Sequence, residues 1–322
     1  MPSDPVSAWR DGQVDARAID RATACLRAGG VVGMPTETVY GLAARAEDAV
    51  AVGRVFQIKG RPLNHPVIVH VGGPQDIAAW AVQVPRYARD LAAALWPGPL
   101  TLVVPAAEST GRYLTGGQDT VGLRCPAHPV ALALIETAGA VAAPSANRFG
   151  HVSPVTAGDV VADLGDRLED TDLVLDGGAC PVGVESTILD CTGSAPRVLR
   201  WGAIELADIH AAGGVAVDAA HSAVRAPGGL ASHYAPNARV HQRGLPTAGA
   251  GLIALAGVDT PPGVVRLAIP ATPREFASVL YRGLRDADGM GLSDIWVLAP
   301  ADSSALSKAV RDRVTRASVR SF

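Results

Sequence analysis

The sequence predicts an α/β protein, with a mixed sheet and flanking helices in its N-terminal part and a smaller α/β unit at its C-terminal end. The chain has 322 residues, 48% of them hydrophobic, which is enough to bury a large core and favours about two domains. Helical apolar spacing alternates with some of the β-rich runs and not with others, which predicts a mixed sheet. A passage rich in Gly, Ala and Pro over 213–237 predicts a linker.

In the N-terminal part, helices are expected over 15–28 and 48–59, where apolar residues recur every three or four positions. Gly29 and Gly30 stand where the first helix should stop. A short helix is expected after Trp201. Apolar and β-branched runs predict strands at 31–34, 66–71, 100–104, 120–125, 140–143, 173–175, 186–190 and 198–201.

The C-terminal unit begins near Val240 and alternates strands with helices, as in a small Rossmann-like unit. Thr272 and Glu275 fit a capping box with proline at the first helical position. Strands are expected at 252–256, 264–269 and 295–299, and helices at 272–286 and 304–318. The predicted domain bounds are 1–210 for the first unit, 211–239 for the linker and 240–322 for the second unit.

The charge balance argues against a protein that is permanently covered by nucleic acid. The chain has 28 Lys and Arg against 31 Asp and Glu, so it lacks the surplus of cations that phosphate neutralisation needs, and any RNA contact should be local or transient. Residues 1–15 lack a signal-peptide core, and no apolar run reaches the ~18 residues of a membrane span, which predicts a cytoplasmic protein. The four cysteines show no C-x-x-C spacing and predict small buried side chains, not a zinc site or a disulfide.

Lys59 and Arg61 follow the second expected helix, where cations also serve simply as partners of a helix C-terminus. Pro62 and the apolar run after it should hold Arg61 in place, and a fixed guanidinium binds phosphate oxygens in a bidentate manner. Their position between a helix and a turn predicts exposed, preorganised cations. His70 alternates with apolar residues on a strand and by itself predicts a buried, satisfied histidine.

Arg124 ends an otherwise apolar strand and therefore needs an anion, either an internal carboxylate or a ligand, because an unpaired buried arginine is costly. Ser145 and Ser153 follow the strand expected at 140–143, the position where open α/β sheets bind ligands, although such hydroxyls also cap turns. The sequence contains no Walker phosphate loop, no H-E-x-x-H helix and no G-x-S-x-G elbow. The glycines of 249–254 precede a strand, so they do not fit a dinucleotide fingerprint.

Between about residues 16 and 204 the chain resembles the YrdC-type threonylcarbamoyl-AMP synthase family in its long form, which has a linker and a C-terminal extension domain. The resemblance lies in the ordered motifs PTETVYGL, KGRP, PVIVHV, WPGPLT, VGLRCPAHP, APSAN and GVESTILD. It implies a twisted mixed sheet of the YrdC type and a nucleotidyltransferase that joins L-threonine, bicarbonate or CO2 and ATP into threonylcarbamoyl-adenylate with release of pyrophosphate. Partner proteins use that product to modify tRNA, and Mg2+ carried by ATP is the implied cofactor.

By motif, the resemblance assigns L-threonine binding to Thr38, His70, Arg124 and Ser186, with Arg124 taking the carboxylate. It assigns catalysis to Lys59 and Arg61. It assigns ATP binding to Lys59, Arg61, His65, Thr120, Ala143, Ser145, Ser153 and Arg200, with Tyr234 as a nearby contact because Ala231 stands where some relatives have tyrosine. The chemistry agrees, because a threonine carbamate that attacks the α-phosphorus needs two anions held together and neutralised, not a protein nucleophile.

The sequence departs from the family pattern at Asn64, at His65 and at Trp201, which follows Arg200. The prolines and glycines of 226–236 predict a flap that closes over the nucleotide. Two other classes remain open. One is a double-stranded RNA binding module without catalysis, and the other is a carbamoyl-adenylate transfer domain of the hydrogenase-maturation type, whose acylphosphatase and zinc-finger segments this sequence lacks.

Overall fold

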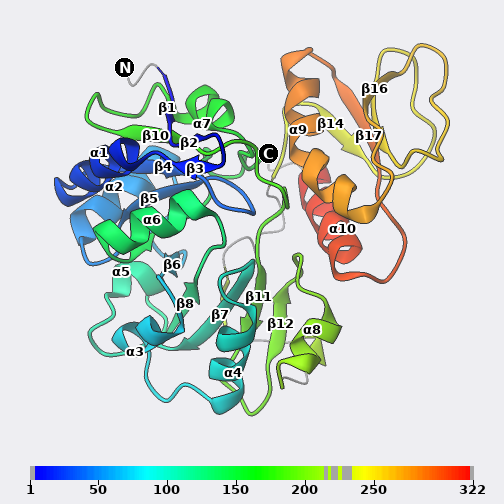
Figure 1. Ribbon diagram of the computed structural model, residues 1–322. Coiled ribbons are helices and arrows are strands. Elements are labelled where there is room, and N and C mark those ends of the chain that lie inside the picture. The colour runs from blue at the N-terminus through cyan, green and yellow to red at the C-terminus, as the bar shows by residue number, and fades with distance from the viewer. Residues whose placement is uncertain (1–3, 214–216, 219–223, 227–233, 320–322) are drawn as a thin grey trace.

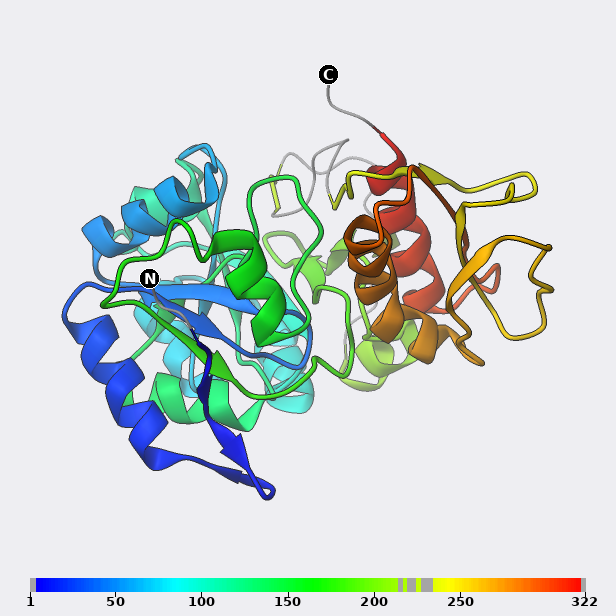
Figure 2. The ribbon, with the colours of Figure 1, turned by 90° about the horizontal axis from the view of Figure 1, so that it is seen from above.

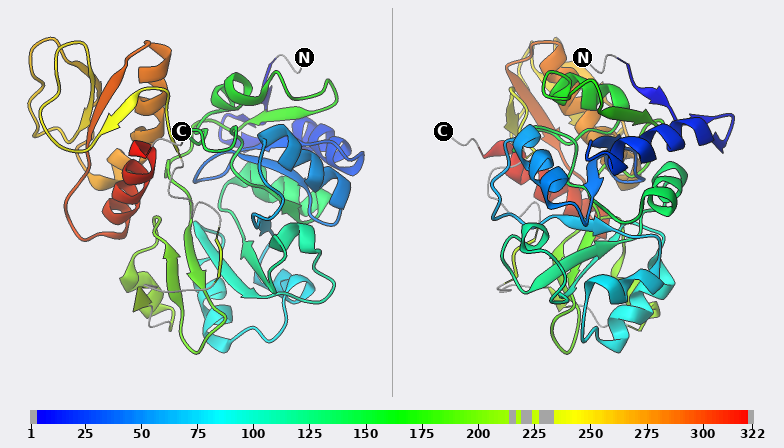
Figure 3. Two further views of the ribbon diagram at one scale, coloured as in Figure 1. Left: turned by 180° about the vertical axis from the view of Figure 1, so that it is seen from behind. Right: turned by 90° about the vertical axis from the view of Figure 1, so that its left-hand side faces the viewer.

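The computed structural model describes residues 4–213, 217–218, 224–226 and 234–319. Most of the expected flap, including Gly228, Gly229 and Ala231, lies outside the described residues. The described chain forms an 11-stranded mixed sheet, a 4-stranded parallel sheet and a 2-stranded hairpin, with helices beside the sheets (Figure 1). The mixed α/β fold that the sequence predicts is confirmed. Figure 2 and the left view of Figure 3 show the C-terminal sheet and its helices as a body beside the N-terminal one.

The large sheet has the order β1-β10-β4-β5-β9-β6-β8-β7-β11-β12-β13. Its strands are β1 (Val6–Ser7), β4 (Val32–Met34), β5 (Gly41–Arg45), β6 (Ile68–His70), β7 (Leu100–Pro105), β8 (Thr120–Arg124), β9 (Val141–Ala142), β10 (Leu173–Asp176), β11 (Thr187–Asp190), β12 (Arg197–Arg200) and β13 (Val217–Asp218). The hairpin consists of β2 (Trp9–Arg10) and β3 (Gln13–Val14). The helices of this part are α1 (Ala16–Arg27), α2 (Ala49–Lys59), η1 (Pro74–Asp76), α3 (Ile77–Trp80), α4 (Arg86–Leu95), α5 (Arg112–Thr115), α6 (Pro129–Ala138), α7 (Ala157–Leu164) and α8 (Leu206–Ala211).

The sequence missed β5, which lies partly within the PTETVYGL motif. This strand contains no β-branched residue, so its local composition gives no strand signal. Pairing on both sides, antiparallel with β4 and with β9, makes it a central strand of the sheet. Other neighbours, such as β6 and β8, are parallel, and the sheet is therefore mixed.

Helices cover both faces of this sheet because successive strand residues point to opposite sides. Ala43 of β5 packs with α1 and α6 in one core cluster. Leu42 and Ala44, its neighbours, pack in the other cluster, which includes α2. Because helices cover both faces of the sheet, a ligand is expected to bind where the strands end.

The C-terminal sheet has the order β14-β17-β15-β16, and all of its strands are parallel. Its elements are β14 (Arg239–His241), β15 (Gly251–Ala254), β16 (Val265–Ala268), α9 (Pro273–Gly289), β17 (Asp294–Leu298) and α10 (Ala305–Ser318). Thr272 caps α9 by accepting from the Glu275 amide, but the Glu275 carboxylate accepts from Ala271 and not from Thr272. The expected capping box is therefore only half formed. No helix of the described chain is both long and apolar enough to span a membrane.

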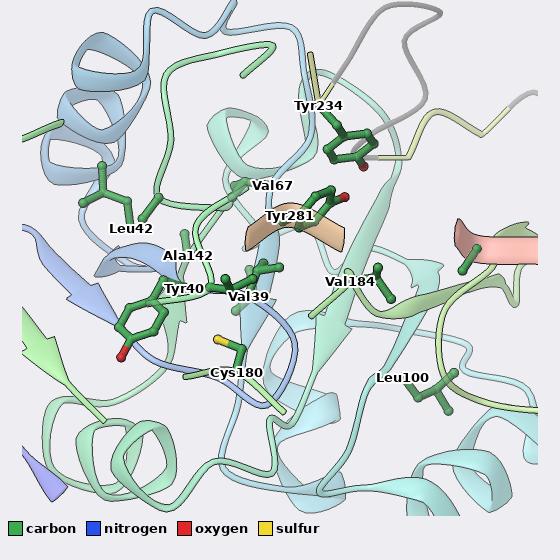
Figure 4. Close-up of a cluster of buried hydrophobic side chains, with 14 of the residues drawn as sticks. Val39, Tyr40, Leu42, Val67, Leu100, Ala142, Cys180, Val184, Tyr234 and Tyr281 are labelled. Carbon is green, nitrogen blue, oxygen red and sulfur yellow. The ribbon is translucent and has the colours of Figure 1, made fainter. Parts of the chain in front are cut away.

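One hydrophobic cluster runs from the N-terminal sheet into the C-terminal unit. It joins residues such as Val39 and Val184 to Tyr234 and Tyr281, which lie next to one another in Figure 4. Cys125, Cys180 and Cys191 also belong to it and are buried free thiols, as the sequence predicts, whereas Cys25 is only partly buried. Because the cluster continues across the two sheets, the C-terminal unit packs directly on the N-terminal one.

A buried carboxylate ties α2 to the loop before β10. Asp172 is fully buried and accepts from the Val31 amide and from both terminal nitrogens of Arg54 at 2.7 and 2.6 Å. We expect Asp172→Ala to lower the free energy of unfolding by about 3–5 kcal/mol, because it leaves the Val31 amide and Nη1 of Arg54 without this acceptor. Glu169→Ala is the matched control. Its carboxylate meets the same Arg54 at the surface, with 68% of the side chain exposed, and should cost about 1 kcal/mol or less in urea unfolding.

Candidate functional site

A cavity of about 50 Å3 lies where β6, β8, β9 and β12 end and where β5 and β11 begin. Most of its lining comes from the end residues of these strands and from the residues next to them. Those that the sequence predicts as site residues and that line the cavity are Thr38, Arg61, His70, Arg124, Ala143, Ser145, Ser186, Arg200 and Tyr234. Small-molecule sites usually measure roughly 300–1,000 Å3, so this cavity is small for a ligand of nucleotide size.

Strand register brings these residues together. His70 and Arg124 are Cα partners at the ends of the parallel strands β6 and β8, so both side chains arise at the same edge. Ser145 follows β9 and forms a bridge with Gly41, at the start of β5. Arg200 ends β12 and donates from Nε to the Ser186 carbonyl at 3.0 Å and from Nη2 to the Ser186 hydroxyl at 3.0 Å.

Arg124 meets an internal carboxylate, one of the two anions that its sequence position allows. Its Nη2 lies 2.8 Å from Oε1 of Glu37, and both side chains are at least nine-tenths buried. The contact is an ion pair in distance, but neither atom makes a hydrogen bond of good geometry within the described chain. Both atoms therefore keep hydrogen-bonding capacity, and Arg124, which lines the cavity, can turn toward a bound carboxylate.

His70 is buried beside Arg124. Burial first, and the Arg124 charge second, lower the pKa of His70 to about 3, so its ring is neutral at physiological pH. Its Nδ1 is buried and has no hydrogen-bond partner among the described residues. A neutral ring with a free nitrogen suits a polar, uncharged ligand group and adds no pH switch between pH 5 and 8.

Arg61 is a second cation that lines the cavity, and its guanidinium is held in place by its neighbours. Its Nη2 donates to the Pro66 carbonyl at 2.7 Å, and its guanidinium lies 5.8 Å from the Phe56 ring and 6.0 Å from the Phe149 ring. Its Nε is buried without a partner in the described chain. Burial is the main cause that lowers the pKa of Arg61 to about 10, which still leaves it charged at neutral pH.

The expectation that Lys59 and Arg61 are exposed is wrong, because they are 2% and 8% exposed. The Lys59 ammonium does not line the cavity and donates to the carbonyls of Ser145 and Asn147 at 2.5 Å each. Burial, and then the Arg61 charge, hold the pKa of Lys59 well below its usual range. Lys59 stabilises the loop of Ser145 through these two hydrogen bonds, so a substitution of Lys59 changes the conformation of the site as well as its charge.

Three other predicted residues do not line the cavity. His65 packs edge-on against Phe149, the ring next to Arg61. Thr120 begins β8, at the opposite end of that strand from Arg124. Ser153 is fully buried and donates to Glu185 at 2.7 Å.

The sequence reasoning assigned no role to two buried acids of the cavity region, Glu37 and Glu185. Glu37 lies inside the motif PTETVYGL, and Glu185 lies inside GVESTILD. A buried Arg124 needs an anion, and this requirement could have pointed to Glu37 as its partner. Among the described residues, no group of three or more His, Cys, Asp or Glu side chains is placed to hold a metal ion.

Comparisons with known proteins identify the family of this chain. The family model described as Telomere recombination, for Sua5, YciO and YrdC proteins, matches residues 24–202, and the model described as Threonylcarbamoyl-AMP synthase, C-terminal domain, matches residues 204–319. The chain belongs to the Sua5/YciO/YrdC family. It is a long-form member, because the second match covers the C-terminal unit.

Curated relatives of this family member carry the name threonylcarbamoyl-AMP synthase. The protein from Pyrococcus abyssi is 44% identical over 230 residues, and that from Bacillus subtilis is 41% identical over 227 residues. Each alignment covers 68% of this chain but only 66% and 65% of the relatives' own lengths, just under two thirds.

Solved structures extend the likeness to the whole chain. The crystal structure of P. abyssi Sua5 complexed with L-threonine is 35% identical, with a TM-score of 0.88 and coverage of 98% of both chains. A structure of the same archaeal protein with a histidine and a tyrosine replaced by alanine is 33% identical, with a TM-score of 0.86 and coverage of 98% of this chain and 96% of that one. The fold of this family member therefore matches that of Sua5 over both units.

Proposed function

We propose that this protein is a threonylcarbamoyl-AMP synthase, which joins L-threonine, bicarbonate or CO2 and ATP into threonylcarbamoyl-adenylate and releases pyrophosphate. The observation that carries the proposal is the cavity in which the neutral His70 and Arg124 stand at one side and the fixed cations Arg61 and Arg200 at the other. Membership of the family and the threonine complex of P. abyssi Sua5 support it.

At the threonine side, Arg124 binds the carboxylate of the amino acid, and the hydroxyls of Thr38 and Ser186 take its polar groups. The threonine nitrogen attacks CO2 and loses a proton, which yields a carbamate. Holding that carbamate beside the α-phosphate converts the next step into an intramolecular one, and this accounts for much of the rate gain.

At the nucleotide side, a carbamate oxygen attacks the α-phosphorus and pyrophosphate leaves. Arg61 and Arg200 neutralise the charge that develops on the phosphate oxygens, while Lys59 fixes the Ser145 loop. ATP enters as its magnesium salt, because triphosphate oxygens are ligands that Mg2+ prefers. The remaining predicted ATP contacts, at His65, Thr120, Ala143, Ser153 and Tyr234, belong to the same proposal.

The product is a mixed anhydride, so partner proteins that modify tRNA must take it up before water does. We place this reaction in the cytoplasm, with at most transient contact between the protein and tRNA, in line with its acidic charge balance.

The test is threonine-dependent pyrophosphate release by the purified protein with ATP, Mg2+ and bicarbonate. We expect release with L-threonine and little without it. Release at the same rate without threonine, or none with it, would contradict the proposal. Trapping the adenylate by mass spectrometry identifies the product directly.

A further inference from the structure

Glu185 is a buried carboxylate in the cavity wall that draws most of its partners from the C-terminal unit. It accepts from the Arg313 Nε at 2.9 Å and from the Tyr281 hydroxyl at 3.0 and 3.1 Å. From its own unit it accepts from Ser153. Arg313 on α10 is fully buried, and so is Tyr281 on α9. The C-terminal unit thus reaches through the interface to a residue that lines the substrate cavity.

The same two residues also hold the tyrosine that lines the cavity. The Tyr234 ring stacks on Tyr281, with 5.7 Å between centroids and 27° between planes (Figure 4). The Arg313 guanidinium lies 5.6 Å from the Tyr234 ring. Tyr234 has a positive φ of 63°, which its packing between these groups maintains. One wall of the cavity is therefore built on α9 and α10.

The backbone of the loop that carries Glu185 packs directly against the backbone of α9 at Gly183. Gly183 has a φ of +75°, and a Cβ at this position would lie 2.5 Å from the Ser278 Cα and 2.6 Å from the Ala277 carbonyl oxygen. Only a glycine allows this approach. The contact sets the distance between the Glu185 loop and the helix that carries Tyr281.

We infer that Arg313 and Tyr281 are positioning residues for the phosphate half of the site, which the C-terminal unit completes by neutralising and orienting Glu185 beside the cavity. The inference rests on the proposed function, because it assigns the site to ATP. It gives the C-terminal unit a role in nucleotide affinity, not merely in stability.

Charge explains why the site needs Arg313. Burial opposes ionisation of Glu185, but the charges of Arg313 and Arg200 and hydrogen bonds from Ser153 and Arg313 outweigh it and lower the pKa of the carboxyl to about 2. The carboxylate is then ionised at every physiological pH. Without Arg313, the Glu185 carboxylate is left with Arg200 and the neutral hydroxyls of Ser153, Tyr281 and Tyr234 as its neighbours. Its negative charge then repels the polyphosphate of ATP, so ATP binding weakens.

Docking of the two units does not depend on Arg313. The Ala305 amide at the start of α10 donates to the Glu205 carboxylate, and Lys308 lies 4.2 Å from the Trp201 ring. Arg285 donates to the Val152 carbonyl. These contacts remain in a variant that lacks Arg313, so we expect it to fold.

The test measures ATP affinity by calorimetry on the full chain, with L-threonine present. We expect Arg313→Ala to weaken ATP binding roughly tenfold or more, while threonine affinity changes little. Arg311→Ala is the matched control, since Arg311 lies on the same helix and donates to the carbonyls of Pro300 and Asp302. The double variant Glu185→Gln with Arg313→Ala should regain most of the ATP affinity, because it removes the unpaired charge.

The pH profile separates this role from a structural one. Losing Arg313 raises the pKa of Glu185, so the ATP affinity of Arg313→Ala should recover as the pH falls and the carboxyl is protonated. A second pair of variants keeps every charge: Gly183→Ala should weaken ATP binding by displacing α9, whereas Gly178→Ala, with a φ of +86° and no atom within 4 Å of its Cβ, should not.

Wild-type protein that binds no ATP would overturn the proposed function and this inference together. Wild-type binding with an equal affinity in Arg313→Ala would overturn the inference alone. So would a double variant that binds ATP no better than Arg313→Ala, because an uncharged amide in place of the Glu185 carboxylate relieves an unpaired charge but cannot restore lost packing.

Discussion

Arg61→Ala should lower the turnover of adenylate formation by about 10²-fold or more, the usual cost of removing a preorganised group that neutralises transition-state charge. The structure holds this guanidinium between Phe56 and Phe149 with one hydrogen bond to Pro66, so it is oriented before ATP arrives. Its buried Nε, which has no partner in the described chain, is a donor that phosphate can satisfy.

Arg61→Lys is the companion variant, because it keeps the charge and loses the planar fork. We expect its turnover to lie between those of Arg61→Ala and the wild type. Thermal unfolding of each variant checks the alternative role. A variant with normal turnover and a large loss of melting temperature would show that Arg61 serves the fold instead.

Arg124→Lys should weaken L-threonine binding by about 1.5–3 kcal/mol, the scale of charge-assisted hydrogen bonds, with little change in ATP affinity. Lysine keeps the charge, but a single ammonium cannot pair with Glu37 and also grip a carboxylate with two parallel hydrogen bonds. Titrating the variant with each substrate in turn measures both affinities. Unchanged threonine affinity would remove Arg124 from the carboxylate site.

Glu37→Gln provides a matched control for that experiment. It removes the partner of Arg124 at 2.8 Å and leaves the guanidinium in place. The threonine carboxylate then no longer competes with an internal anion for Arg124, so threonine should bind at least as tightly as in the wild type. Weaker binding would mean that Glu37 serves mainly to aim Arg124, through the ion pair itself.

Local sequence predicted the elements whose signals are local. The helix over 48–59 appears as Ala49–Lys59, capped by Asp48 and stopped by Gly60 in the left-handed region, because capping and helical periodicity depend on adjacent residues. Three of the four strands of the C-terminal sheet and both of its helices followed from the same kind of pattern, whereas β14 was missed. Most of the site residues that were predicted from the family motifs line one cavity, because residues next to strand ends lie at the same edge of the sheet.

The order of the amino acids was enough to predict α1, α2, α8, α9 and α10, most of the strands, the mixed sheet and the set of cations and hydroxyls at its edge, but it gave no prediction for α3 to α7. Packing in three dimensions was needed to show that Gly41–Arg45 is a central strand, that Lys59 is buried under the Ser145 loop, and that Glu37 faces Arg124. It also brought Arg313 to Glu185, 128 positions apart in the chain. Burial and ion pairing depend on which surfaces meet in space, and no local pattern records the meeting of two distant surfaces.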